Sequence, residues 1–114
     1  MTAFSEIDYA LTRGQNVLAL VEVKTRTNAL GAYATYMISA HKIEFGLRWE
    51  RTFGIPFLLV VEFTDGIYWV KVSEIPFKVE MGGRRDRGDK DDTEIVVHFK
   101  SSLMRPLVAA ENAA

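Results

Sequence analysis

The first apolar segments of the chain alternate with polar residues, a pattern typical of β-strands. Residues 4–12 and 17–24 are the two predicted strands, and the Arg-Gly-Gln-Asn stretch at 13–16 is a turn signal between them. The second strand is apolar on both faces until it ends in two opposite charges, Glu22 and Lys24. Because strand side chains alternate between faces, both charges leave the sheet on the same side. They either reach a cleft or escape past the edge of the sheet.

A long helix is predicted over residues 33–53, because this stretch contains no proline and is followed by Gly-Ile-Pro at 54–56. One stripe of the helix contains Ile38, His41, Lys42, Phe45, Trp49 and Phe53. The stripe nearly opposite contains Tyr36, Ala40, Ile43 and Leu47. A helix that is apolar on two sides needs two covers. The sheet is one, and the other is either the C-terminal segment or a second copy of the chain, which makes the second apolar face a predicted homodimer contact.

Further strands follow the helix. Residues 57–63 form an apolar strand, and the Asp-Gly pair at 65–66 predicts a two-residue hairpin turn before a return strand over 68–72. Short strands are predicted over 77–80 and 94–100, with a glycine-rich and charge-rich mobile loop between them. The pattern predicts an α+β fold, a mixed β-sheet with one long helix packed on it. We expect one domain over residues 1–108 and a frayed tail over 109–114.

Composition narrows the chemistry. The chain has 114 residues, of which 48% are hydrophobic, and it contains no cysteine, which excludes disulfides and thiolate zinc sites. No apolar run is long enough to cross a membrane, the first residues do not resemble a signal peptide, and we expect a cytoplasmic protein. With only His41 and His98 as imidazole ligands, a metal site must consist mainly of carboxylates, which suits magnesium or manganese. The net charge of −1 gives no support to a nucleic-acid partner.

Asp8, in the first strand, is the acid that can face Glu22. A three-residue hairpin loop sets Asp8 opposite Glu22, with about 5 Å between the Cβ atoms. A two-residue loop instead sets Asp8 opposite Val21, on the wrong face, unless a bulge corrects the register. A shared site therefore predicts an odd loop or a bulge in this hairpin.

Two facing carboxylates are costly unless one is protonated or a cation lies between them. A hard divalent cation accepts oxygen ligands and lowers the pKa of a bound water. Asp8 and Glu22 can supply carboxylates, and the Val23 carbonyl is near enough to be a third oxygen. Lys24 can orient or deprotonate an attacking water, or pair with a phosphate. Lys42 either extends to the rim of the helix or enters the site. The set points to metal-dependent phosphodiester cleavage, and the alternative is a solvated ion pair at the end of a strand.

Ile7-Asp8, a gap of thirteen residues and then Glu22-Val23-Lys24 resembles the signature of the PD-(D/E)XK, restriction-endonuclease-like nuclease superfamily. The likeness spans roughly residues 4–72, is closest to small resolvase-like or phage-type members, and implies a core that lacks the usual first helix. By this resemblance, Asp8 and Glu22 bind Mg²⁺ or Mn²⁺, Lys24 assists the water, Lys42 is an auxiliary basic residue, and DNA is the substrate. The alternative is a non-catalytic binding or assembly module that keeps the nuclease-like fold.

Overall fold

The computed structural model describes residues 9–83 and 93–107, which form eight strands in two sheets and one α-helix. The strands are β1 (Tyr9–Arg13), β2 (Asn16–Thr25), β3 (Thr35–Ser39), β4 (Phe57–Phe63), β5 (Gly66–Lys71), β6 (Lys78–Gly83), β7 (Thr93–Lys100) and β8 (Arg105–Pro106). The α-helix is α1 (Ala40–Phe53), and short 3-10 turns occur at Leu30–Ala32, Val72–Glu74 and Ser101–Leu103. The α+β class is therefore confirmed.

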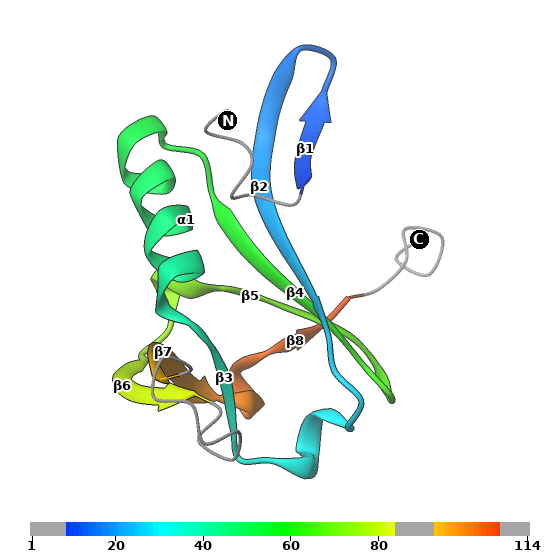
Figure 1. Cartoon of the computed structure of the whole chain (residues 1–114). Helices are drawn as coiled ribbons and strands as arrows, with labels where there is room; N and C mark the ends of the chain where they lie inside the picture. The colour runs from blue at the N-terminus through cyan, green and yellow to red at the C-terminus, as the bar shows by residue number, and fades with distance from the viewer. Residues whose placement is uncertain (1–8, 84–92, 108–114) are drawn as a thin grey trace.

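The larger sheet has five strands in the order β1-β2-β4-β5-β8 (Figure 1). It is mixed, because β2 and β4 run parallel while the other neighbours are antiparallel. The predicted strand over 57–63 is confirmed in both bounds, and the strand predicted over 17–24 extends by one residue at each end. A parallel pair needs a long crossover, and the crossover from β2 to β4 contains β3 and α1.

The hairpin between β1 and β2 contains the predicted register correction. Its turn has two residues, and a bulge follows between Leu11 and Thr12. Beyond this bulge, Tyr9 pairs with Val21 and not with the residue that the tight turn alone would set opposite it. The expected odd loop or bulge is thus confirmed. Asp8 itself, with the rest of residues 1–8, lies outside the described residues.

The predicted helix over 33–53 begins too early. Residues 35–39 form strand β3, which pairs antiparallel with β7, and α1 starts only at Ala40. Tyr36 and Ile38 are both buried, because residues two apart on a strand lie on the same face. The prediction was wrong because Tyr36 also fits the helical spacing of Ala40, Ile43 and Leu47. The helix ends where predicted, at Gly54, which has φ 70° and donates its N–H to the Glu50 carbonyl.

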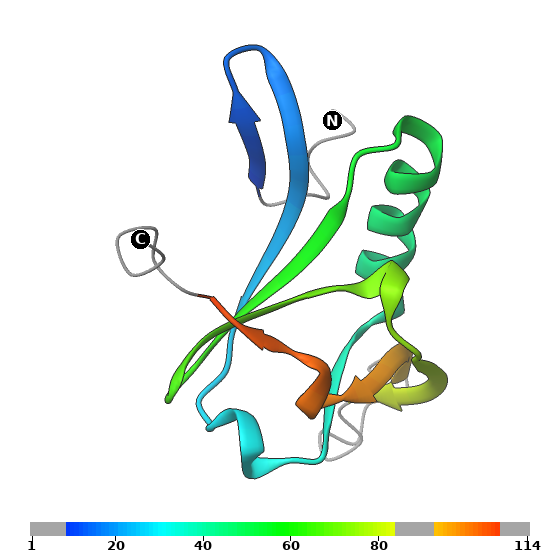
Figure 2. The same cartoon turned by 180° about the vertical axis from the view of Figure 1, so that it is seen from behind.

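β3 belongs to a second, antiparallel sheet with the order β3-β7-β6, so the fold has two sheets where one was expected. Figures 1 and 2 show this three-stranded sheet at the N-terminal end of α1. The helix packs on β4 of the larger sheet and on β3 and β7 of the smaller one. The helix was expected to need a cover on each of its two apolar sides. The three-stranded sheet supplies part of the second cover.

Two contacts fix α1 on β4. The ring of Phe57 fills the space that a Cβ atom on Gly46 would occupy, so helix and strand approach closely only because this position has no side chain. At the end of the helix, the Glu50 carboxylate accepts a hydrogen bond of 2.8 Å from the Phe57 backbone N–H. These contacts hold the middle and the end of α1 against β4.

The turn between β4 and β5 is shifted by one residue from the prediction. Its two residues are Thr64 and Asp65, and Gly66 is the first residue of β5. The Thr64 N–H donates to the Asn28 carbonyl at 3.1 Å, and the Asp65 carboxylate accepts from the Leu30 N–H at 3.0 Å. Both turn residues are thus held by hydrogen bonds to the segment after β2.

Two expected mobile segments fall largely outside the described residues. β6 continues to Gly83, into the predicted loop, and residues 84–92 and 108–114 are not described. Within the described residues, no helix is long and apolar enough to cross a membrane.

Candidate active site

Glu22 lies in the interior of the molecule. It is on the same face of β2 as the fully buried Leu20, and only 1% of Glu22 is exposed. Its register partner on β4 is Leu59, which is also fully buried. A carboxylate in such surroundings needs compensating positive charge or protonation, because burial of an isolated charge is very costly.

Two lysines supply that charge. Lys24 Nζ lies 3.4 Å from Glu22 Oε2, and Lys42 Nζ lies 4.0 Å from Glu22 Oε1. Lys24 comes from the same strand and Lys42 from the first turn of α1. The prediction that Glu22 and Lys24 share a face is confirmed, and of the two alternatives for Lys42, entry into the site is the one observed. Both lysine side chains are partly exposed, so the site opens to solvent on the lysine side.

Lys24 also lines a cleft. The cleft has a volume of about 290 Å³ and extends along the end of β2 to Arg26, with Ser39 and Glu94 on the opposite wall. A larger hollow of about 660 Å³ continues from it, sharing Arg26 and Met37. The charged end of β2 therefore reaches a cleft, the first of the two alternatives that the sequence left open.

Tyr36 is a neighbour of the site that sequence reasoning missed. It was expected on the second apolar stripe of the helix, but it lies on β3, with the Arg26 guanidinium 4.8 Å from the centre of its ring. Arg26 also donates to the Thr25 and Met37 carbonyls, each at 3.3 Å. The Tyr36 hydroxyl is buried and has no hydrogen-bond partner among the described residues. Because Met37, between Tyr36 and Ile38, is also apolar, the local sequence contains no alternation that could have revealed this position.

The Tyr36 phenol stays neutral at physiological pH. Burial raises the pKa of Tyr36 to about 12, with Arg26 lowering this pKa and the Glu22 carboxylate raising it. Tyr36 lines the larger hollow together with Arg26, and its buried hydroxyl is a hydrogen-bond donor that no described residue uses.

The predicted metal ligands are only partly described. Glu22 is in place, the Val23 side chain is partly exposed on the other face of β2, and Asp8 lies outside the described residues. Within residues 9–83 and 93–107, no group of three or more His, Asp or Glu side chains could hold a metal ion. Of the two histidines considered as ligands, His98 lies with its Nε2 atom 3.8 Å from Glu80 Oε2. The predicted donor set consists only of oxygen atoms, so its chemistry fits a hard cation.

A family model described as "Phage putative PDDEXK endonuclease" matches residues 1–107. Among solved structures, the chain is similar to Hjc, a Holliday junction resolvase from the archaeal hyperthermophile Archaeoglobus fulgidus. The two share 15% identity with a TM-score of 0.48, over 89% of this chain and 68% of the other. No curated protein shows significant similarity to the chain.

Proposed function

Because the chain belongs to the phage PDDEXK endonuclease family, we propose that it is a metal-dependent endonuclease that hydrolyses phosphodiester bonds in DNA. The family match bears out the resemblance to the PD-(D/E)XK superfamily noted in the sequence and supports a nuclease of the endonuclease type. One observation carries the finer proposal, the buried Glu22 carboxylate between the ammonium groups of Lys24 and Lys42.

Asp8, Glu22 and the Val23 carbonyl would hold the metal, which we propose to be Mg²⁺ or Mn²⁺. PD-(D/E)XK nucleases generally use divalent metals, and carboxylate and carbonyl oxygens are the ligands that these ions prefer. When bound, such an ion neutralises phosphate charge and lowers the pKa of a water.

The lysines act on the substrate side of Glu22. Each is partly exposed, so each can keep its contact with Glu22 and still donate a hydrogen bond toward a bound phosphate or water. We assign Lys24 to the attacking water, which it orients for in-line displacement, and Lys42 to the negative charge that develops on the phosphate. The low exposure of Glu22 strengthens both interactions, since charges interact more strongly where water is excluded.

A second candidate function is a non-catalytic binding or assembly module that keeps the nuclease fold. The net charge of −1 favours it, because proteins that bind DNA through bulk charge are usually more basic. In either case we propose a cytoplasmic protein that forms a homodimer. The proposed contact includes the second apolar face of α1, which contributes Ala40, Ile43 and Leu47 to a groove on the surface.

Cleavage of supercoiled plasmid and of branched DNA, with Mg²⁺ or with EDTA, tests the proposal. We expect cleavage only with the metal, and a rate about 10²–10⁴-fold lower for Lys24→Ala, the range that a positioned acid–base group contributes. Lys71→Ala is the matched control, because Lys71 is also a partly exposed lysine, paired with Glu74 at 3.6 Å and outside the site. Equal rates for wild type and Lys24→Ala would refute the catalytic proposal. Binding of DNA without cleavage by either protein would support the non-catalytic module.

A further inference from the structure

Strand β6 lies at the edge of the three-stranded sheet. Among the strands that the structure describes, only β7 pairs with it. Along β6, Val79 is 59% exposed and Met81 is 61% exposed. Natural proteins usually protect an edge strand from pairing with other chains, and a long edge with apolar side chains is a template for such pairing. The exposed edge of β6 is therefore a surface on which another strand can add.

The apolar side chains of β6 continue the face of the sheet that packs on the helix. Val79 pairs with Val97 of β7, and Val97 pairs in turn with Ile38 of β3, so the three share one face. Val97 and Ile38 are buried, whereas Val79 is not. The cover over this face is thus complete at Ile38 and Val97 and incomplete at Val79 of β6 and Ile95 of β7.

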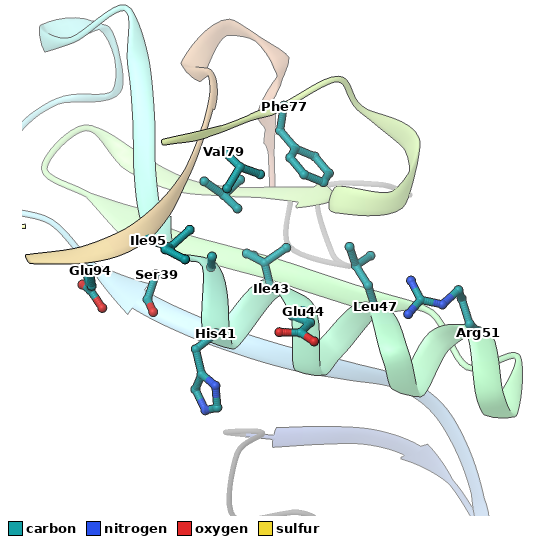
Figure 3. A pocket seen from close by; sticks show the side chains of 12 residues that line it. Ser39, His41, Ile43, Glu44, Leu47, Arg51, Phe77, Val79, Glu94 and Ile95 are labelled. Carbon is teal, nitrogen blue, oxygen red and sulfur yellow. The ribbon is translucent and has the colours of Figure 1, made fainter. Parts of the chain in front are cut away.

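A groove of about 550 Å³ runs along the uncovered part. Figure 3 shows Ile43 and Leu47 pointing from α1 toward Phe77 and Val79, with Ile95 beside them, while His41 points away. Apolar side chains from α1, β6 and β7 line most of the groove, and the charged side chains along it are those of Glu44, Arg51 and Glu94. A strand that adds to β6 with apolar side chains on this same face would close it.

The sequence of β6 and of the residue before it is self-complementary. Residues 77–81 read Phe-Lys-Val-Glu-Met, apolar at both ends and in the middle, with opposite charges at the two positions between. If two copies pair antiparallel with Val79 facing Val79, each Lys78 faces Glu80 of the second copy. In the same register, each Phe77 faces Met81 of the second copy. All apolar pairs then lie on the groove face, and all charged pairs lie on the other.

Other symmetric registers are less favourable. Pairing centred on Lys78 or on Glu80 sets two like charges directly opposite each other, which is destabilising. Pairing centred on Met81 sets Val79 opposite a glycine. A shift by a single residue turns the apolar set of one copy away from the groove. Of the registers centred on residues 78–81, the one centred on Val79 satisfies both faces of the strand.

We propose that two copies of the chain associate through antiparallel pairing of their β6 strands, centred on Val79. The result is a continuous six-stranded sheet with a two-fold axis, in which Phe77 and Met81 of each copy flank the groove of the other. This deepens the homodimer that is part of the proposed function, and it does not depend on DNA cleavage.

Charge reversal on β6 tests this register. Lys78→Glu places four carboxylates across the two-fold axis, and Glu80→Lys places four ammonium groups there. We expect each single variant to dimerise at least about tenfold more weakly than wild type, because two attractive cross-strand pairs become repulsive. An equimolar mixture of the two variants restores both attractive pairs, so a heterodimer should form with wild-type affinity. Analytical ultracentrifugation over a concentration series without DNA measures all of these species.

The double variant Lys78→Glu/Glu80→Lys is expected to dimerise like wild type. It keeps both cross-strand pairs while it loses the 3.8 Å contact between Glu80 and His98, so it separates the interface from that contact. Arg13→Glu and Glu62→Lys are matched controls, with the same charge changes at exposed positions of the larger sheet, and should leave dimerisation unchanged. Circular dichroism verifies that each variant is folded.

A wild-type protein that stays monomeric throughout the series would overturn the proposal. So would a dimer that both single variants leave intact, or a mixture of the two variants that does not associate. Because cleavage is measured separately, loss of nuclease activity with an intact dimer contradicts the proposed function alone.

Discussion

The two sheets depart from the ordinary distribution of residues in opposite directions. In the five-stranded sheet, a charged side chain, Glu22, is buried beside fully buried Leu20 and Leu59. In the three-stranded sheet, apolar side chains such as Val79 and Ile95 are exposed on a strand face whose inner part is buried. Both sheets follow the same alternation along their strands, so the difference arises from what covers them and not from local sequence.

Each departure has a cost that folding alone does not explain. A buried ion pair is often no more stabilising than apolar residues of the same volume, so Glu22 and its lysines are poorly explained by stability. An exposed apolar edge invites association, so the β6 surface is poorly explained in an isolated chain. Departures from local rules are expected at functional sites. The comparison therefore separates a chemical site from an assembly surface, and the following variants test that separation.

The largest expected effect on stability comes from truncating a buried side chain, and it compares how well each of the two sheets is covered. Leu59→Ala removes a fully buried side chain beside Glu22 and should lower the free energy of unfolding by about 2–5 kcal/mol. Ile95→Ala makes a similar truncation where 52% of the residue is exposed, and should cost less than about 1 kcal/mol. Urea denaturation followed by tryptophan fluorescence, at concentrations low enough to exclude association, measures both values. Equal losses would mean that the three-stranded sheet is as well covered as the larger one.

Glu22→Gln tests whether the buried carboxylate serves chemistry. Removal of a group that only supports a metal ligand typically lowers metal affinity or activity by about 10–100-fold. Removal of the proposed ligand itself should therefore lower the cleavage rate by at least about 100-fold, which raises the activation free energy by ~2.7 kcal/mol. The stability should change little, because Lys24 and Lys42 are partly exposed and can be solvated without their partner. Plasmid cleavage and thermal denaturation are measured on the same preparation. A variant that unfolds but retains specific activity in its folded fraction would assign Glu22 to structure.

Much of the site is predictable from sequence because its determinants are local. The period-two alternation sets Glu22 and Lys24 on one face, and the hypothesis that Asp8 shares their face leads to the expectation of an odd loop or a bulge. Both features are present in β1 and β2. The apolar run of β4 is predicted in both bounds, because a proline precedes it and a turn follows it.

The remainder depends on partners that are distant in sequence. Residues 35–39 are a strand because β7 pairs with them, and no feature near Tyr36 reveals that partner. The position of the Tyr36 hydroxyl beside the site follows from this pairing, so it could not be predicted either. The sequence leaves open whether the Lys42 side chain reaches the site. Its position depends on how closely α1 approaches β4, and the lack of a side chain at Gly46 permits that approach.

Gly46→Ala tests the approach of α1 to β4. The added Cβ meets the Phe57 ring, and overpacking of this kind costs about 1–3 kcal/mol. The higher helix propensity of alanine offsets up to about 1 kcal/mol of that loss. We expect a net decrease in the free energy of unfolding, together with slower cleavage, since Lys42 lies one turn before Gly46 on the helix. Gly31→Ala is the control, because a Cβ there meets nothing within 4 Å. A Gly46→Ala protein as stable and as active as wild type would show that the close approach does not set the site.

The smallest effect concerns the Tyr36 hydroxyl. A buried hydroxyl without a partner is unfavourable, so Tyr36→Phe should raise the free energy of unfolding by about 1 kcal/mol at pH 7. The pKa of Tyr36 is raised from 10.0 to about 12 in the folded protein, so the folded state holds this proton more tightly than the unfolded chain. The resulting stabilisation is complete below pH 10 and is lost as the pH rises through 12.

Wild type should therefore lose more stability than Tyr36→Phe between pH 10 and pH 12. Urea titrations at pH 7, 10 and 11 on both proteins measure this difference, and parallel pH profiles would contradict it. Cleavage assays on the same variant show whether the hydroxyl also contributes to the reaction.

The pairing of β3 with β7 has a consequence for the order in which the protein is completed. β3 ends at Ser39, directly before α1, yet its partner begins only at Thr93. The end of the helix that carries Lys42 therefore gains its neighbour only when the last long strand has been synthesised. Pairings between segments so far apart form slowly, because the loop between them must close first. A chain still on the ribosome should thus be unable to cut DNA, and cleavage should begin only after β7 has folded onto β3. Ribosome-bound chains that end before residue 93 should show no cleavage, and activity in such chains would contradict this order.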